Sequence, residues 1–185
     1  MVSNSERFFP PENGFHHSPT SLSSENERSL HRLNRAISLS QGEFSLILCV
    51  CNRPALRRKV TKQLQNISPL KVSELTLHPS VNTLFSTVQT ALQNQSPDAL
   101  VILGLESVVN LDDLLSSTNL VRELFAQKFA FPLVLWVNDD TLIKLTRIYT
   151  DFRSWGGSSI RFEVSCSQDA PQNHYWPLQY QIVTG

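Results

Sequence analysis

The sequence has few glycines, few charged residues and no long apolar runs, and each shortage excludes a class of function. Only 6 glycines occur in 185 residues, and none lies in the stretch CVCNRPALRRKVTKQL, residues 49–64. Charged residues make up 17% of the chain, and basic and acidic residues balance at 16 each. This balance gives the whole molecule no net field toward nucleic acid or a membrane surface. No apolar run approaches the length of a transmembrane helix, and the first residues lack the apolar core of a signal peptide.

Cysteine is also scarce. The chain has 3 cysteines, an odd number that argues against a disulfide framework. Cys49 and Cys51 lie in an apolar run and, as alternate residues of a strand, point to the same face. We therefore expect buried free thiols in the core rather than ligands, in a reducing compartment, and place the protein in the cytoplasm.

The composition divides the chain into three parts. Residues 1–23 are rich in Ser, Pro, Asn and His and predict a disordered tail. Residues 24–165 predict one α/β domain, and residues 166–185 a linker or a C-terminal stump. The pair His16–His17 could bind a metal, but without Cys or acidic neighbours the pattern favours solvated side chains.

Strand and helix patterns alternate along the domain. Apolar runs predict strands at residues 44–51, 71–77, 99–105, 132–138 and 160–164. Between them, periodic segments predict helices at residues 24–42, 54–64, 78–92 and 111–129, and one capped by Asp139 or Asp140. The pair Ser24 and Glu27 forms a capping-box pattern, and Pro54 suits a first helical turn. This order predicts an α/β fold with a mainly parallel five-stranded sheet and helices on both faces.

The end of the first strand lacks a phosphate-binding loop. A nucleotide-binding domain would have G-x-x-x-x-G-K-[ST] or G-x-G-x-x-G here, because the backbone must approach phosphate closely. The sequence has no glycine there, and Pro54 removes an amide donor. Lys59 and Thr61 have the side chains of a Walker lysine and hydroxyl, but no glycine-rich loop precedes them to direct them toward a phosphate. Walker-type ATP hydrolysis is therefore disfavoured.

The helix after the first strand is nevertheless basic. Its start supplies a candidate anion or nucleotide site, made of Asn52, Arg53, Arg57, Arg58 and Lys59. A solvated basic surface, or pairing with acids elsewhere, is the favoured alternative. A DNA-binding role is a third, weaker possibility, because the cluster is short, has no interleaved aromatic residues and belongs to a neutral chain.

Two further strand ends carry polar residues. After the third strand, Gly104 stands where a magnesium-binding Asp would be expected, and Glu106 is a candidate displaced acid. Glu106 could instead cap the next segment or be exposed. After the fourth strand, Asn138 and Asp139 are sensor-like candidates, although helix capping is the favoured role of Asn138. No metal site is predicted.

Several phrases carry a family resemblance. They are ENERSLHRLNRAISLSQGEFSLILCVCN, DALVILGLESV with LLSSTNLVRE, FPLVLWVNDDTLIKL and DFRSWGG. Over about residues 25–164 the chain resembles the N-terminal domain of large cyanobacterial proteins, a domain similar to the core of P-loop signalling ATPases of the STAND and AAA-like group. The resemblance implies a P-loop NTPase-like three-layer sandwich, a role in signalling or assembly, and tetratricopeptide repeats after the domain. The sequence departs at both nucleotide motifs and ends without such repeats, so we expect a truncated, split or stand-alone member.

These observations lead to two hypotheses from different classes. The leading one is a non-catalytic NTPase-like domain without a phosphate loop, acting as a protein-interaction or regulatory module. Under this hypothesis we expect no cofactor, apart from weak binding of ATP or another nucleotide. We expect a protein partner, such as a tetratricopeptide-repeat protein, rather than nucleic acid or a membrane. The alternative is a STAND-type ATPase switch that binds a nucleotide or phosphate ligand through the basic helix.

Overall fold

The core of the protein is a five-stranded sheet in which every strand pair is parallel. The computed structural model describes residues 21–93, 95–148 and 159–164. The strands are β1 (Ser45–Val50), β2 (Val72–Thr76), β3 (Ala99–Leu103), β4 (Pro132–Val137) and β5 (Ile160–Arg161). Their order is β2-β3-β4-β1-β5, which places β2 at one edge of the sheet. The predicted parallel sheet is confirmed.

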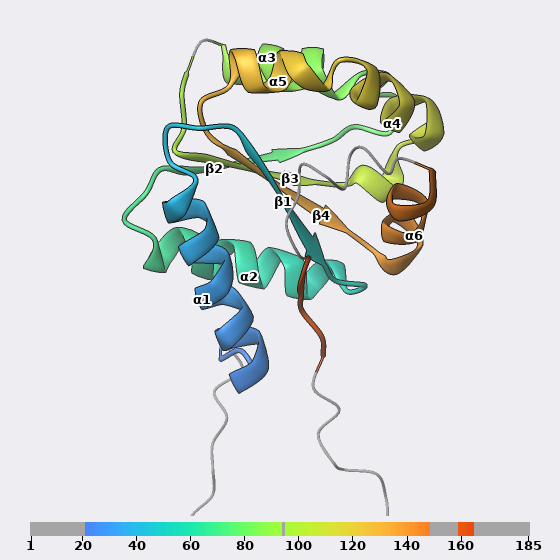
Figure 1. Ribbon diagram of the computed structural model, residues 1–185. Coiled ribbons are helices and arrows are strands. Elements are labelled where there is room, and N and C mark those ends of the chain that lie inside the picture. Colours follow the sequence, from blue (N-terminus) through green and yellow to red (C-terminus); the bar gives the residue numbers. More distant parts are fainter. Residues whose placement is uncertain (1–20, 94, 149–158, 165–185) are drawn as a thin grey trace, which may run out of the picture.

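Helices cover both faces of this sheet (Figure 1). They are α1 (Ser24–Leu39), α2 (Pro54–Ile67), α3 (Leu84–Leu92), α4 (Leu111–Leu120), α5 (Arg122–Lys128) and α6 (Asp139–Ile148), with a short 3-10 helix η1 (Leu105–Ser107). The buried residues of α1 and α2 pack on one face, and those of α3, α4, α5 and α6 pack on the other. The α/β architecture predicted from the sequence is therefore correct.

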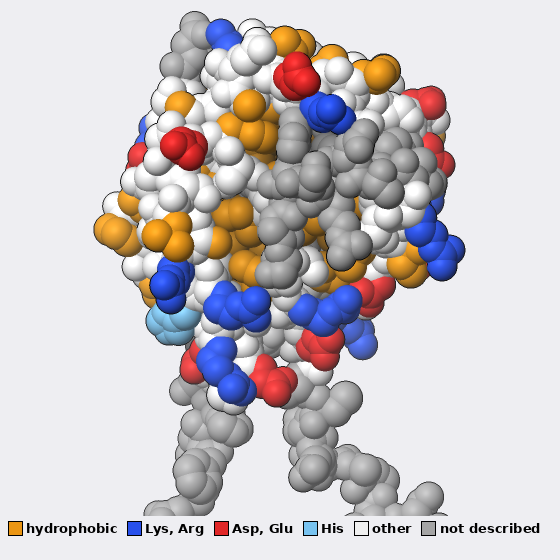
Figure 2. All heavy atoms as spheres, viewed as in Figure 1, with side chains coloured by type: hydrophobic (Ala, Val, Ile, Leu, Met, Phe, Trp, Pro, Cys, Tyr) orange, Lys and Arg blue, Asp and Glu red, His pale blue; other side chains and the backbone are white. Residues whose placement is uncertain are grey.

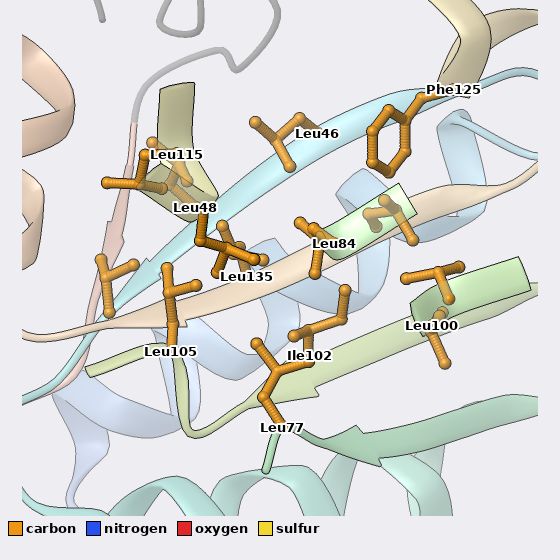
Figure 3. Packing of buried hydrophobic residues seen from close by; sticks show 14 of the residues in the cluster. Leu46, Leu48, Leu77, Leu84, Leu100, Ile102, Leu105, Leu115, Phe125 and Leu135 are labelled. Atoms are coloured by element: carbon orange, nitrogen blue, oxygen red, sulfur yellow. The ribbon is translucent and has the colours of Figure 1, made fainter. Parts of the chain in front are cut away.

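Side-chain alternation along the strands divides the core in two. On β1, Leu46, Leu48 and Val50 face α3–α6, whereas Ile47 and Cys49 face α1 and α2. Both faces of the central strands are apolar because helices cover both. Figure 3 shows the first of these cores, in which side chains from the strands meet those of the covering helices.

Aromatic rings strengthen each core in a different place. Beneath α5, Phe125 lies with its ring centroid 5.2 Å from that of Phe85 and 5.7 Å from that of Phe129. On the opposite face, the rings of Trp136 and Phe162 are 5.1 Å apart. Such pairs add to the energy gained from burial alone. The Trp136–Phe162 contact fastens the segment after β5 to the middle of the sheet.

The first helix begins at Ser24 as predicted, but its predicted cap is wrong, and so is the predicted start of the third helix. Ser23 rather than Ser24 caps α1, and its hydroxyl accepts a hydrogen bond from the Asn26 amide at 3.3 Å. The third helix begins at Leu84, not at residues 78–80. The preceding segment is a loop because the Pro79 carbonyl accepts a hydrogen bond from the Val109 amide, 2.9 Å away, which ties it to a distant turn.

The long helix predicted at residues 111–129 is also wrong, since it is broken at Val121 into α4 and α5. The hydroxyls of Ser117 and Thr118 both donate to the Leu114 carbonyl, at 2.9 and 2.7 Å. Ser and Thr side chains that bond to the backbone in this way weaken or bend a helix. The fifth strand is likewise shorter than predicted, with only Ile160 and Arg161 in the ladder.

Some sequence predictions fall outside the described residues. These are the predicted tail up to residue 20 with His16–His17, the phrase DFRSWGG, and residues 166–185. Within the described residues, no helix is both long enough and apolar enough to cross a bilayer.

A single buried side chain joins the two ends of the described chain. Asn26, on the first turn of α1, is only 5% exposed. Its Nδ2 donates to the Glu163 carbonyl at 2.6 Å, and its Oδ1 accepts from the Glu163 amide at 3.0 Å. The side-chain amide thus pairs with the backbone after β5 as a neighbouring strand would. A two-residue strand gains little from its own ladder, so this pairing helps to hold it against β1.

We predict that Asn26→Ala destabilises the fold by about 1 kcal/mol or more, because it removes two part-buried hydrogen bonds to the Glu163 backbone. Urea unfolding followed by tryptophan fluorescence would measure the loss. Asn66→Ala is the matched control, since Asn66 is exposed near the end of α2. Equal stability of the two variants would contradict the role given to the Asn26 amide.

Candidate functional site

Among the strands that lead into a described helix, one neighbouring pair leads to opposite faces of the sheet. β1 and β4 are paired in parallel, yet β1 continues into α2 on one face and β4 into α6 on the other. In open α/β sheets, ligands bind in the crevice that forms at such a switch point, outside the carboxyl ends of the strands. The residues that follow these two strands are Asn52 and Asn138–Asp139, and they belong to the set predicted from the sequence.

Asn52 and Asp139 bond to each other across this switch point. Nδ2 of Asn52 donates to Oδ2 of Asp139 at 2.6 Å, and Oδ1 of Asn52 accepts from the Asp139 amide at 3.0 Å. Arg161, on β5, donates through a guanidinium nitrogen to Oδ1 of Asp139 at 2.7 Å. Hydrogen bonds from Asn52, and then from Arg161 with its positive charge, lower the pKa of the Asp139 carboxyl. Asp139 therefore connects three strand ends: β4, β1 and β5.

Arg57 and Glu106, predicted as parts of separate anion and acid sites, form an ion pair with each other. The side chain of Arg57 is 4% exposed, and that of Glu106 is 24% exposed. The guanidinium also donates from Nε to the Cys51 carbonyl at 2.7 Å, at the end of β1. Arg57 thus points back to the sheet edge. There the Glu106 carboxylate neutralises its charge, and the Cys51 carbonyl accepts one of its hydrogen bonds. A buried charge needs such partners, because desolvation would otherwise cost several kcal/mol.

Gly104 makes the position of Glu106 possible. Its φ is +81°, a left-handed conformation that disfavours residues with a Cβ. A Cβ placed there would lie 3.1 Å from the Leu77 carbonyl oxygen, which is closer than an ordinary contact. An aspartate at this position would meet both strain and crowding. The backbone after β3 is therefore built for glycine, and the acid that approaches β1 comes from the η1 turn instead.

The remaining predicted residues do not converge on one point. Arg53 and Arg58 are exposed, whereas Lys59 reaches away from the sheet edge and donates to the Ser21 carbonyl at 2.7 Å. Oδ1 of Asn138 accepts from the Thr141 amide at 2.8 Å, which confirms Asn138 as the cap of α6. The cap predicted at Asp139 or Asp140 is wrong, because both residues lie inside the helix.

Cys49 and Cys51 are buried as predicted. Burial, and then the neighbouring Cys51, raise the pKa of the Cys49 thiol far above its ordinary value. A thiol in that environment remains protonated at neutral pH and packs as a small apolar side chain.

A hollow of about 230 Å³ lies between the start of α2 and the ends of β2 and β3. It is lined by Pro54, Arg57, Arg58, Glu74, Thr76, Leu103, Gly104, Glu106 and Ser107. Its two carboxylates oppose its two guanidinium groups, so the lining is balanced rather than suited to a polyanion. Within the described ranges, no group of three or more His, Cys, Asp or Glu side chains is placed to hold a metal ion.

Sequence reasoning missed Arg161. It grouped residues by the strand end that each follows, whereas Arg161 lies within β5 and reaches Asp139 only because β5 pairs with β1. The signal available was a basic residue between the apolar residues Ile160 and Phe162. The strand order that gives this signal its meaning was not accessible from the residues.

Comparisons with known proteins add no relative. No family model matches the chain, and searches of curated proteins and of solved structures also find no match.

We predict that Glu106→Gln lowers the free energy of unfolding by about 2–3 kcal/mol, because it leaves the buried Arg57 charge without a counter-charge. Arg57→Met should cost a similar amount, and the Arg57→Met/Glu106→Leu double variant less than the two single changes together. A denaturation double-mutant cycle measures the coupling. Arg58→Met is the control, since Arg58 is exposed on the next position of α2. Additive losses would show that the pair is not coupled.

We also predict a pH dependence that depends on Asp139. Since its pKa is lower in the folded protein, its bonds stabilise the fold above the unfolded carboxyl pKa of about 3.9, and this stability is lost as pH falls through the folded value. The Asp139→Asn variant should therefore be less stable than wild type at pH 7. The difference in unfolding free energy between the two proteins, measured by urea titration, should shrink as the pH is lowered toward 3. Asp113→Asn, an exposed change of equal charge on α4, should retain the wild-type acid dependence. Identical curves for both variants would exclude this role of Asp139.

Proposed function

We propose that this protein is a non-catalytic domain of P-loop NTPase-like architecture that acts as a protein-interaction or regulatory module. The observation that carries the proposal is that the polar side chains at the ligand-binding edge of the sheet bond to one another. Arg57 pairs with Glu106, and Asn52 with Asp139. To bind a ligand through these groups, the protein would have to break bonds that stabilise its fold.

The local backbone supports the same proposal. The connection from β1 to α2 contains no glycine, and α2 begins with Pro54 and without a side-chain cap. A phosphate-binding loop needs several backbone amides that point at one anion, and proline supplies none. After β3, Gly104 offers no carboxylate for a metal. The groups that hold phosphate and magnesium in an ATPase thus have no equivalents at the two strand ends concerned.

The resemblance of the sequence to a family of signalling ATPase-like domains supports a role in signalling or assembly. A parallel sheet with helices on both faces is compatible with a P-loop-type sandwich. A signalling or assembly role beside a tetratricopeptide-repeat protein fits a domain that keeps this scaffold without the catalytic groups. The buried thiols of Cys49 and Cys51 fit a reducing compartment, so we place the protein in the cytoplasm.

The test is a panel of nucleotides with magnesium, read as phosphate release and as a shift in thermal unfolding. We predict no turnover above the blank and no stabilisation by ATP, ADP, GTP or inorganic phosphate. A nucleotide present at a hundredfold excess over its dissociation constant would stabilise the fold by about 2.7 kcal/mol, which is easily measured.

Two outcomes would overturn the proposal. Steady, metal-dependent turnover that disappears in Lys59→Ala or Glu106→Gln would make the protein an ATPase. Stabilisation by a nucleotide that is lost in Arg53→Ala/Arg58→Ala but kept in Lys71→Ala would establish the alternative, a ligand-binding switch that uses the basic start of α2. Lys71 is a suitable control because it is exposed just before β2, away from the start of α2.

A further inference from the structure

The charges of this protein give it no strong field of one sign. The chain has 16 basic and 16 acidic residues. On the face shown in Figure 2, basic and acidic side chains lie interspersed over the lower part of the surface. A charged ligand therefore meets little long-range attraction, and its recognition depends on small groups of side chains that face one another.

The hollow between the start of α2 and the ends of β2 and β3 contains such a group. Arg58 contributes to its lining from α2, and Glu74 and Thr76 contribute from β2. Leu75 packs in the core beneath α3–α6, so its neighbours Glu74 and Thr76 face the side of the sheet on which α2 lies. Glu106, which follows β3, lines the hollow as well. Three separate elements thus bring polar side chains to one hollow.

The bonding capacity of these side chains is largely unused. Within the described residues, Arg58 and Glu74 are exposed and form no ion pair with each other or with another side chain. Glu106 gives Oε1 to Arg57, whereas its Oε2 is buried and has no hydrogen-bond partner among the described groups. A buried acceptor without a donor is destabilising. The hollow therefore combines an unpaired cation, an unpaired anion and an unsatisfied acceptor.

This combination selects a small ligand that carries both charges. The two carboxylates of the lining would repel a polyanion, and its two guanidinium groups would repel a metal cation. An apolar ligand would remove water from the charged groups without replacing its hydrogen bonds. A molecule with one carboxylate and one ammonium group leaves the site neutral and gives each unpaired charge an opposite partner.

The size of the hollow limits the ligand further. Its volume of about 230 Å³ is below the range of about 300–1,000 Å³ that is typical of sites for drug-sized molecules. A free amino acid has both required charges within a few bonds of each other and is smaller than a drug-sized molecule. The chemistry and the volume therefore point to the same class of compound.

We propose that this hollow binds a free α-amino acid. Arg58 receives the carboxylate, because a guanidinium group binds a carboxylate through two parallel hydrogen bonds. The ammonium group donates to Glu74 and to Oε2 of Glu106. The ion pair between Arg57 and Oε1 of Glu106 is kept, so binding does not require the fold to give up this contact. The inference goes beyond the proposed function, because it gives an interaction or regulatory module a small-molecule signal.

The probe is a panel of free α-amino acids, added singly to the full chain, and binding is measured by isothermal titration calorimetry. Arg58→Gln and Glu74→Gln each remove one charge from the hollow and keep a polar side chain. Their controls are Lys62→Gln, an exposed change one turn further along α2, and Glu123→Gln, an exposed change on α5. Neither control residue lines the hollow. Circular dichroism verifies that each variant is folded.

Two derivatives of the amino acid that binds best test the need for both charges. Its amide lacks the carboxylate, and its N-acetyl derivative lacks the ammonium group. We expect at least one amino acid to bind the wild type with a dissociation constant of about 1 mM or below. Each derivative and each test variant should weaken binding by roughly fivefold or more, and each control variant by less than about twofold.

Three results would overturn the inference: no binding by any amino acid of the panel, equally tight binding of either derivative, or equal losses in control and test variants. Tight binding of the N-acetyl derivative would show a simple anion site, and equal losses would show binding elsewhere on the protein. No nucleotide takes part in these measurements, so this inference and the non-catalytic role can fail separately.

Discussion

The carboxyl edge of this sheet is organised around a buried positive charge. Arg57 lies on the first turns of α2 with its guanidinium almost fully removed from solvent, which is tolerable only with a carboxylate and further acceptors in contact. Glu106 and the Cys51 carbonyl supply them. Glu106 can reach Arg57 because Gly104 turns the chain through a left-handed conformation directly after β3. The ion pair thus depends on one glycine, and the packing of α2 against the strand ends depends on the ion pair.

A second polar connection runs in the opposite direction along the same edge. Asp139 receives hydrogen bonds from Asn52 after β1 and from Arg161 on β5. β5 has only two residues in the sheet, and further attachments come from the Phe162 amide, which donates to the Val50 carbonyl at 2.8 Å, from the Trp136–Phe162 contact and from the Asn26 side chain of α1. The segment that leaves the sheet after β5 is therefore held by groups from α1, β4 and the switch point together. A substitution of Asp139 would therefore weaken the attachment of this segment, because Arg161 of β5 bonds to Asp139.

The sequence was most informative where one physical effect dominated. Continuous apolar runs identified the buried parallel strands β1, β3 and β4, because only helices on both faces allow a strand without a polar side. It was least informative where side-chain bonds compete with periodicity. The helix that apolar spacing predicted as continuous is interrupted at Val121, after Ser117 and Thr118, whose hydroxyls bond to the Leu114 carbonyl and weaken the helix there. The pairing of Arg57 with Glu106 was considered only as a general possibility, because it depends on a strand order that places β3 beside β4 and β4 beside β1.

Two adjacent arginines of α2, Arg57 and Arg58, differ in burial and in the groups that surround them. The buried Arg57 is paired with Glu106 at the sheet edge, so a phosphate ligand would have to displace Glu106 to bind it. The neighbouring Arg58 is exposed and lies at the hollow beside Glu74 and Thr76 of β2. Charges that are already paired in the fold contribute little to the recognition of a new ligand, so a ligand that used the paired groups at the strand ends would have to compete with bonds that stabilise the fold.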